Sequence, residues 1–384
     1  MRDRPGNTYT VERILFTSTI FEIIVMIKDY AGPRAVFPFT AIVNQERLKL
    51  ALLLNAINPR IGGVLIRGPK GTGKSTAVRA LVDLLPEVDV VEGCPFGCNP
   101  SDPTNMCDIC GSRVESGEAL PSVRRRMRVV DLPIGATEDR VVGTLNIERA
   151  IREGVRALEP GLLAEANQNV LYIDEINLLP DHITDVILDA AASGWNTVER
   201  EGISVQHPSR FILVGTMNPE EGELRPQLLD RMSLHTGIAT IEDPKLRVEV
   251  MRSNIEFEDA PIEFRQRHLN EQKDLMARIL RAKELFLKVG VSDSLYDVVA
   301  RMSISLKADG HRPDIVMIKS ARTLAALRGR GSVEPEDIME CAYLALSHRT
   351  RNLGMDPPAS EGQIEEAFKS ALAMVKGKGM SAPA

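Results

Sequence analysis

The run GGVLIRGPKGTGKSTAVRAL, Gly62 to Leu81, decides the fold. It has the spacing G-x-x-x-x-G-K-[ST] of a phosphate-binding loop, after an apolar strand pattern and before a helical one. Backbone N–H groups and a helix amino terminus stabilise phosphate charge, so this order predicts a site for ATP or GTP. We expect Lys74 to reach the β- and γ-phosphates and the Ser75 hydroxyl to bind Mg²⁺. The candidate loop residues are Gly68, Pro69, Lys70, Gly71, Thr72, Gly73, Lys74, Ser75 and Thr76.

The bulk composition is that of a two-domain globular protein of 384 residues with 43% hydrophobic residues. Aromatic residues make up only 4% and the net charge is −6, so neither base stacking nor electrostatics favours nucleic acid or an anionic membrane. The apolar tract Ile14–Ile27 contains Glu22 and is too short to span a bilayer. A signal peptide and a start of translation at Met26 remain alternatives for this end. We expect a cytoplasmic protein whose residues 1–36 form a poorly ordered extension.

The rest of the chain divides by pattern into an α/β region and a helical region. Strand patterns recur at 63–66, 88–91, 129–132, 170–173 and 211–214, with helical patterns between most of them. This alternation predicts a parallel sheet in a nucleotide-binding domain over residues 37–243. Helical patterns then occupy 269–289, 295–306, 313–327 and 335–347. They predict a helical lid domain over residues 244–353, followed by a C-terminal tail over 354–384 that frays.

Two later strand patterns end in polar residues that ATP hydrolysis needs. The segment NVLYIDE places Asp174 and Glu175 after an apolar strand, where Asp174 can hold Mg²⁺ and Glu175 can polarise the attacking water. The segment FILVGTMN ends in Asn218, which a neighbouring strand would place near the γ-phosphate to orient water. Following a phosphate loop in this order, both segments favour a hydrolytic site.

Three arginines are candidates for contacts with phosphate from outside this cluster, two of them alternatives for one role. Arg231 follows a short helical pattern and is the predicted arginine finger toward a neighbouring subunit, with Asp230 orienting it or crossing the interface. Arg225 is the alternative finger. Arg312 begins a helix of the second domain and is expected to reach the nucleotide from the lid.

These motifs, in this order, resemble those of the AAA+ ATPases. The sequence around them is similar to that of the I subunits of magnesium chelatases over about residues 37–353. The segments that carry this resemblance include FPFTAIVNQ (37–45), VDLPIGATEDRVVG (130–143), EPGLL (159–163), NPEEG (218–222) and ALSHR (345–349).

The resemblance implies an ATP-hydrolysing motor subunit that drives insertion of Mg²⁺ into protoporphyrin IX, on the route to chlorophylls. It implies a homo-oligomeric ring, expected to be hexameric, together with D-type and H-type subunits. Because the porphyrin site belongs to the H-type subunit, no direct porphyrin site is expected here. It also assigns Asn218 as the first sensor, Arg231 as the finger and Arg312 as the second sensor. Two insertions are implied, around 141–152 and as a hairpin near 194–210.

Three other functions stay open at this point. A DNA motor is disfavoured because the charges of 194–210 balance, with Glu199 and Glu201 against Arg200 and Arg210. A protein-remodelling ATPase shares the same motifs. An equivalent ATPase subunit of a cobalt chelatase differs only in a metal that a separate large subunit would handle.

Four of the five cysteines fall in one turn-rich loop, 94–110, where the sequence departs from the chelatase pattern. Their spacing, C-x₃-C and C-x₂-C, suits a tetrahedral structural Zn²⁺ held by Cys94, Cys98, Cys107 and Cys110. An iron–sulfur cluster, a disulfide switch and unliganded thiols are the alternatives. Cys341 lies in a helical pattern and is interpreted as a buried small residue.

Overall fold

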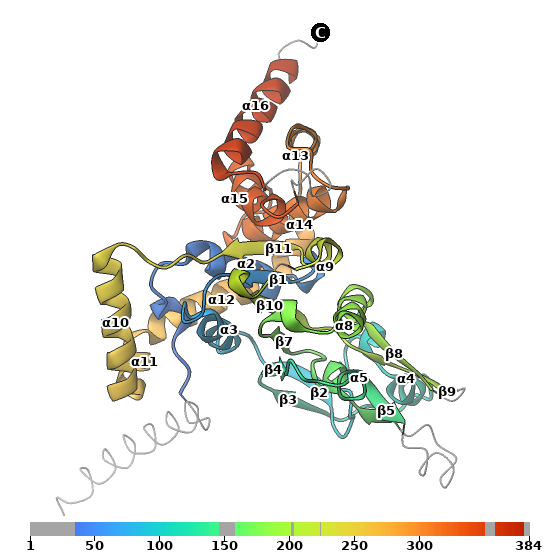
Figure 1. Ribbon diagram of the computed structural model, residues 1–384. Helices are drawn as coiled ribbons and strands as arrows, with labels where there is room; N and C mark the ends of the chain where they lie inside the picture. The colour runs from blue at the N-terminus through green and yellow to red at the C-terminus, as the bar shows by residue number, and fades with distance from the viewer. Residues whose placement is uncertain (1–34, 146–157, 201–202, 223, 350–357, 380–384) are drawn as a thin grey trace, which may run out of the picture.

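The computed structural model describes residues 35–145, 158–200, 203–222, 224–349 and 358–379, and the expected N-terminal extension therefore lies almost wholly outside it. At its centre is a five-stranded sheet in the order β11-β1-β10-β7-β4 (Figure 1). Every neighbouring pair in this sheet is parallel. The strands are β1 (Val64–Arg67), β4 (Val129–Leu132), β7 (Val170–Ile173), β10 (Ile212–Met217) and β11 (Leu234–Gly237).

Both faces of this sheet are covered, which explains why its strands read as continuous apolar runs. Because side chains alternate along a strand, Val64 and Ile66 of β1 face one core and Leu65 faces the other. The first core is closed by α2 (Glu46–Ile57), α3 (Lys74–Val82) and α12 (Leu269–Leu285). The second is closed by α5 (Glu138–Val142), α7 (Leu162–Glu165) and α8 (Asp181–Ser193).

The prediction of a parallel α/β sheet is confirmed, and the strand predicted at 88–91 forms, but it does not belong to that sheet. Strand β2 (Val88–Val91) lies outside the central sheet and pairs antiparallel with β3 (Ser122–Arg125), with half of its residues only partly buried. The fifth central strand is β11, which pairs with β1. Its sequence LHTG has no apolar run, so hydrophobicity gave no strand signal there.

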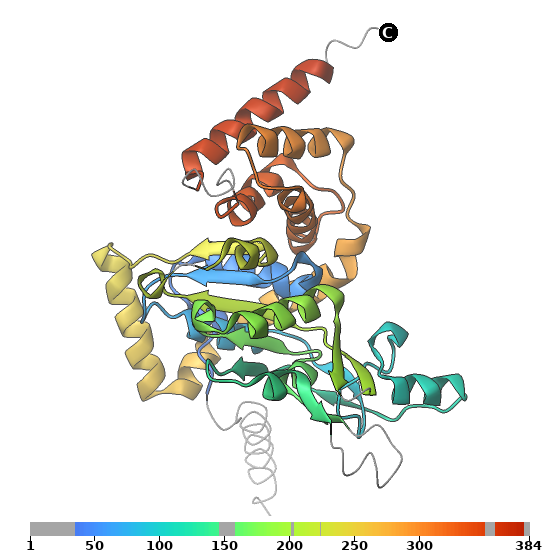
Figure 2. The same cartoon turned by 45° about the vertical axis from the view of Figure 1, so that its right-hand side comes forward.

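The helical region after the sheet was predicted correctly over most of its length, and it has two parts. Helices α10 (Pro244–Asp259) and α11 (Pro261–Arg267) form an arm beside the carboxyl ends of the strands (Figure 2). Helices α13 (Asp293–Ser305), α14 (Arg312–Leu327) and α15 (Pro335–Leu346) gather beyond the β11 edge of the sheet (Figures 1 and 2). Helix α14 packs on α2 and on the turn η2 (Pro59–Ile61).

The expectation that the chain frays beyond Leu353 was wrong for its last described segment. Residues Glu361–Gly379 form α16, which packs on α13 (Figure 1) and buries Ile364, Ala367 and Ala371. Ser360 and Gln363 cap it reciprocally, each side chain bonding the other's backbone N–H, at 3.3 and 2.8 Å. The Pro-, Gly- and Lys-rich composition obscured this Ser-x-x-Gln signature.

The insertion expected near 194–210 is a hairpin of β8 (Trp195–Arg200) and β9 (Ile203–Pro208). The insertion expected around 141–152 is described only through residue 145, where β5 (Gly143–Leu145) pairs with β6 (Leu158–Pro160). Across the described ranges, no helix has the length and apolar character to cross a membrane. The remaining elements are η1 (Phe39–Ala41), η3 (Pro103–Asn105), α4 (Asp108–Glu115), η4 (Ile176–Leu178), η5 (Pro219–Glu221), α9 (Pro226–Arg231) and η6 (Phe286–Lys288).

Candidate active site

The phosphate loop connects β1 to α3, in the strand–loop–helix order that the sequence predicts. Its first glycine, Gly68, sits so close to β11 that an added Cβ would lie 2.6 Å from the carbonyl oxygen of Ile238. Its last glycine, Gly73, has φ of +81°, a left-handed conformation that glycine adopts without strain. The loop therefore needs glycine for close packing at one end and for backbone turning at the other, where α3 begins at Lys74.

Lys74 folds over the loop from the first turn of α3. Its ammonium donates to the carbonyl oxygens of Gly68 at 2.7 Å and Pro69 at 2.8 Å. Burial lowers the pKa of Lys74, against the opposing attraction of Asp174. The ammonium is thus held at the loop by neutral carbonyls, which phosphate oxygens would outcompete as partners because charge-assisted hydrogen bonds are stronger.

Ser75 and Asp174, the two predicted Mg²⁺ ligands, are joined through Tyr172. The phenol of Tyr172 donates to Asp174 Oδ1 at 2.9 Å and lies 3.0 Å from the Ser75 hydroxyl. Thr216 of β10 donates to the same Asp174 oxygen at 2.5 Å. Burial raises the pKa of Tyr172 to about 12, so the phenol keeps the proton that it donates. Asp174 is thereby fixed in place with one oxygen already saturated by donors.

Glu175, the predicted base, has a left-handed backbone with φ of 53°, a strained conformation of the kind that gathers at active sites. Its N–H donates to the Thr216 hydroxyl at 3.2 Å. Lys70 Nζ lies 3.3 Å from Glu175 Oε1 and 2.7 Å from Glu221 Oε1. These two carboxylates raise the pKa of Lys70, Glu221 most strongly, so one loop ammonium bridges the candidate base and a second acid.

Asn218 lies at the carboxyl end of β10, and Glu175 lies beside it, just after the neighbouring strand β7. Asn218 is 4% exposed, and its side-chain oxygen accepts from the Glu220 N–H at 3.3 Å, capping η5. One cleft of about 790 Å³, within the usual size range of a ligand pocket, is lined by Lys70, Lys74, Ser75, Asp174, Glu175 and Asn218. Tyr172, Thr216 and Glu221 contact these residues but are not part of its lining. Its other walls include Ile42 and Gln45, which precede α2, and Arg247 and Asn254 of α10.

Arg231 and Arg225 lie outside this cleft of their own chain. Arg231, at the end of α9, pairs with Asp189 of α8, its Nη1 lying 2.5 Å from Oδ1. Arg225 pairs with Asp181 at the start of α8. The side chain of Asp230, predicted to orient Arg231, lies outside the described part of the structure. The Arg231 partner that the structure does describe is Asp189.

Arg312 begins α14, as predicted, but it is not among the residues that line the cleft. On the same helix, Lys319 donates to the carbonyl oxygen of Arg60 at 2.9 Å. Arg60 belongs to η2, which precedes β1, whereas the phosphate loop follows β1. Because α14 packs on η2, on the amino-terminal side of β1, the expectation that Arg312 reaches the nucleotide of its own chain finds no support in this arrangement.

Comparison with known proteins identifies the family. The chain is 57% identical over 323 residues to the magnesium-chelatase subunit ChlI homolog of Methanocaldococcus jannaschii, a match that covers 84% of this chain and 88% of the relative. It is 51% identical to the magnesium-chelatase subunit ChlI of Synechocystis sp., covering 89% and 96%. The chain belongs to the magnesium-chelatase ChlI family. The resemblance seen in the sequence is thus confirmed.

Family models and solved structures agree with this ChlI assignment. Residues 146–241 match the model of magnesium chelatase, subunit ChlI, and residues 298–370 match that of the AAA lid domain. A structure of the complex between BchI and BchD of magnesium chelatase is similar at 46% identity and a TM-score of 0.50, covering 87% of this chain and all of that one. A putative ATPase of Cytophaga hutchinsonii shares the fold, with a TM-score of 0.53 at 17% identity. The chain is an AAA+ ATPase of the family that uses ATP and Mg²⁺.

The four cysteines of the 94–110 loop converge in this ChlI-family chain. Their sulfur atoms all lie within 4.8 Å of one another, and Cys98, Cys107 and Cys110 are buried. The backbone N–H of Cys107 donates to Cys98 Sγ at 3.1 Å. Contact with the Cys107 and Cys98 sulfurs lowers the pKa of Cys94, which favours a thiolate there. The cluster is therefore a candidate metal centre, while Cys341 is buried in α15, as the sequence suggested.

The structure brings together Lys74, Ser75, Asp174, Glu175 and Asn218, and it leaves Arg225, Arg231 and Arg312 outside their cleft. Sequence reasoning missed four polar partners, namely Tyr172, Asp189, Thr216 and Glu221. Tyr172 could have been predicted from the sequence as a partner of Asp174, because side chains two residues apart on a strand point the same way. The other three contacts join separate elements and have no local signal.

Proposed function

We propose that this chain is the ATP-hydrolysing motor subunit of magnesium chelatase, coupling hydrolysis to insertion of Mg²⁺ into protoporphyrin IX in chlorophyll or bacteriochlorophyll synthesis. One observation carries the proposal: a cleft that joins the phosphate loop to Asp174 and Glu175, in a chain about half identical to ChlI subunits over most of its length. The fold alone would not define the substrate, since many functions share it.

Each residue of the cleft has a role in the proposed hydrolysis. Lys74 and the loop N–H groups would bind the β- and γ-phosphates. Ser75 and Asp174 would hold the Mg²⁺ of MgATP, which offsets phosphate charge. Glu175 would orient and deprotonate the attacking water, with Asn218 as the second polar contact to it. Phosphate binding would draw Lys70 from its carboxylates and thereby release the base.

A second subunit would complete the site. Arg231 lies outside its own cleft, half-buried and held by Asp189 of α8. A fixed arginine in that position suits a contact with the γ-phosphate of an adjacent copy in a homo-oligomeric ring, which we propose is hexameric. In the same ring, Arg312 would serve as a sensor for a neighbouring nucleotide rather than its own.

The proposed partners follow from the family. The complex of BchI with BchD supports a D-type partner for this chain, and an H-type subunit would hold the porphyrin. We place the reaction in the cytoplasm. The relatives are named for magnesium chelatase, which favours Mg²⁺ over the Co²⁺ of the alternative chelatase and over protein remodelling.

Zinc is the cofactor that we propose for the cysteine cluster. A Zn²⁺ bonded at about 2.3 Å to four sulfurs places them about 3.8 Å apart. The Cys94 sulfur lies 3.4 Å from Cys98 and 4.0 Å from Cys107, which fits this spacing. A disulfide requires about 2.05 Å. A four-iron cluster puts each thiolate on a different iron, which spreads the sulfurs around a larger core than one ion needs.

Reconstitution tests the proposed function. The purified chain, D-type and H-type subunits, ATP, Mg²⁺ and protoporphyrin IX should together yield fluorescent magnesium protoporphyrin, and omission of this chain should abolish it. The same assay with Co²⁺ and a corrinoid precursor tests the cobalt alternative. ATP hydrolysis with no metallated product from either set would reject the chelatase role and leave a remodelling ATPase.

A further inference from the structure

The loop that carries the four cysteines has a second side, which faces the base of the β8–β9 hairpin. On that side the Phe96 ring stacks on the His207 ring of β9, with centroids 4.8 Å apart and planes 10° apart. His207 is fully buried, and its Nε2 lies 2.9 Å from the side-chain nitrogen of Asn196 on β8. The loop therefore contacts a residue that is itself bonded across both strands of the hairpin.

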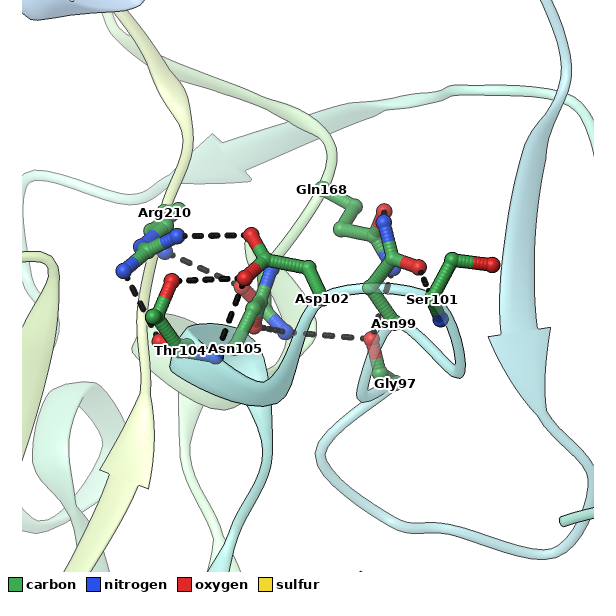
Figure 3. A network of polar contacts seen from close by, with 9 residues as sticks. Gly97, Asn99, Ser101, Asp102, Thr104, Asn105, Gln168 and Arg210 are labelled. Carbon is green, nitrogen blue, oxygen red and sulfur yellow. Dashed lines mark hydrogen bonds and ion pairs between the residues drawn. The ribbon is translucent and has the colours of Figure 1, made fainter. Parts of the chain in front are cut away.

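Arg210 makes the second connection, at the point where the hairpin returns to the sheet. Its guanidinium donates to Asp102 Oδ2 at 3.0 Å and to the Thr104 carbonyl at 2.8 Å (Figure 3). Asp102 also accepts from the Thr104 N–H and hydroxyl, at 2.9 and 2.6 Å, so the turn is held rigidly. The Arg210 side chain covers Gly194, where the hairpin begins. One arginine thus links the loop to both ends of the hairpin.

Two amides before β7 complete the connection. The Asn167 side chain donates to the carbonyls of Phe96 and Gly97, at 2.9 and 3.0 Å, and accepts from the Arg210 N–H at 3.0 Å. Gln168 donates to the Gly97 carbonyl at 3.0 Å (Figure 3). Asn167 is fully buried, so its bonds are shielded from competition with water.

Along the loop, the residues that make these contacts lie between the cysteines. Phe96 and Gly97 lie between Cys94 and Cys98, while Asp102 and Thr104 lie between Cys98 and Cys107. Each of these two pairs therefore lies in a segment whose two ends are cysteines, and one metal ion bound to those cysteines would fix both ends of the segment. Apart from α4 and the turn η3, the loop has no regular structure of its own between β2 and β3. Its internal backbone hydrogen bonds include local turns, such as those of Gly97 N–H to the Cys94 carbonyl and Asn105 N–H to the Asp102 carbonyl, and thiolate–metal bonds would join these turns to one another.

We propose that one zinc ion bound by Cys94, Cys98, Cys107 and Cys110 holds the base of the β8–β9 hairpin in place through Phe96, Asp102 and Arg210. This inference rests on the zinc proposed above and extends it from a local structural site to control of the hairpin. Loss of the metal by chelation releases the hairpin, while the nucleotide cleft, built from other elements, keeps its ability to bind ATP.

The single tryptophan of the chain, Trp195, is the reporter, because it opens β8 at the hairpin base. Metal analysis of the purified chain should find one zinc per chain, and less than a tenth of that in Cys107→Ser. Removal of zinc with a mercurial and a chelator should lower Trp195 anisotropy and speed proteolytic cleavage in the hairpin at least about tenfold. Binding of a fluorescent ATP analogue should change less than about twofold.

A second variant separates the contact from the metal. Asp102→Asn keeps all four cysteines and should retain zinc, yet it should reproduce the anisotropy loss. The control is Glu118→Gln, which breaks an ion pair with Arg113 in the same connection between β2 and β3 and should change neither readout. Zinc present but Trp195 unaffected by its removal overturns the inference and leaves the zinc site. Absence of zinc in a chain that hydrolyses ATP overturns both the inference and the zinc site, and leaves the motor function standing.

Discussion

Lys70 Nζ lies 3.3 Å from Oε1 of Glu175, so a residue of the phosphate loop is paired with the candidate catalytic base. The same ammonium pairs with Glu221 at 2.7 Å, and it is exposed enough to leave both carboxylates. A phosphate group entering the loop offers Lys70 a more highly charged partner. Binding of substrate and release of the base are thereby linked through one side chain.

Replacement of the base should separate binding from hydrolysis. Glu175→Gln keeps the size of the side chain and removes its ability to accept a proton, so kcat should fall by about 10²- to 10⁴-fold. ATP affinity should be unchanged or higher, because a negative charge near the γ-phosphate is lost. Steady-state ATPase rates and titration with a fluorescent ATP analogue measure the two effects.

The matched control for this variant is Glu220→Gln, at the neighbouring exposed acid of η5. It should hydrolyse ATP at the normal rate. Near-normal turnover by Glu175→Gln would remove Glu175 from the role of base.

Tyr172 should set the Mg²⁺ requirement. Tyr172→Phe keeps the ring in the core but removes the phenol that joins Ser75 to Asp174. Loss of one such hydrogen bond costs about 0.5–1.5 kcal/mol, so the Mg²⁺ concentration for half-maximal activity should rise about 3- to 10-fold. At saturating Mg²⁺, kcat should stay within about twofold of normal.

Titration of ATPase activity against Mg²⁺ at fixed ATP measures this change. The control is Tyr343→Phe. The Tyr343 ring belongs to α15 and packs against the Arg47 guanidinium. An unchanged Mg²⁺ dependence in Tyr172→Phe would show that Ser75 and Asp174 hold their positions without the phenol.

Local spacing explains what could be predicted from the sequence, and tertiary contact explains the rest. The phosphate loop and Asp174–Glu175 are motifs within single segments, so the sequence contains them complete. By contrast, β11 is recognisable as a strand only beside β1, because its polar residues give no hydrophobic signal. Arg312 is not among the residues that line the cleft, and the packing of α14 on α2 and η2, which sets its position, is not specified by any property of α14 alone.

The stability of the folded chain should depend on pH through the buried charge of Lys283 in α12. Burial lowers the pKa of this ammonium to about 8, whereas in the unfolded chain it is near 10.5. Below pH 8 the folded chain carries a buried charge, so Lys283→Met should raise the free energy of unfolding by roughly 1–3 kcal/mol at pH 7. From about pH 8 to 10.5 the unfolded chain binds more protons, so the normal chain gains stability and the difference should shrink.

Urea unfolding between pH 7 and 10 measures this difference. Lys273→Met removes an exposed lysine from the same helix and should change stability by less than about 0.5 kcal/mol at every pH. A Lys283→Met effect that does not vary with pH would mean that lost packing, rather than the buried charge, accounts for it.

Arg231 should act on the nucleotide of a neighbouring copy. Arg231→Ala should assemble and bind ATP, yet lose about 10²-fold or more in kcat, because arginine fingers contribute mainly to the transition state. Lys74→Ala should be inactive for a different reason, since it cannot hold phosphate. In mixed rings, an Arg231→Ala cleft can meet an intact finger supplied by a Lys74→Ala subunit. Activity should therefore reappear on mixing and pass through a maximum as the ratio of the two chains is varied, whereas mixing Arg231→Ala with Glu175→Gln,Arg231→Ala should restore none. Failure of the Lys74→Ala mixture at every ratio, with co-assembly verified by differently tagged chains, would reject a finger acting between subunits and leave Arg231 with only its ion pair to Asp189.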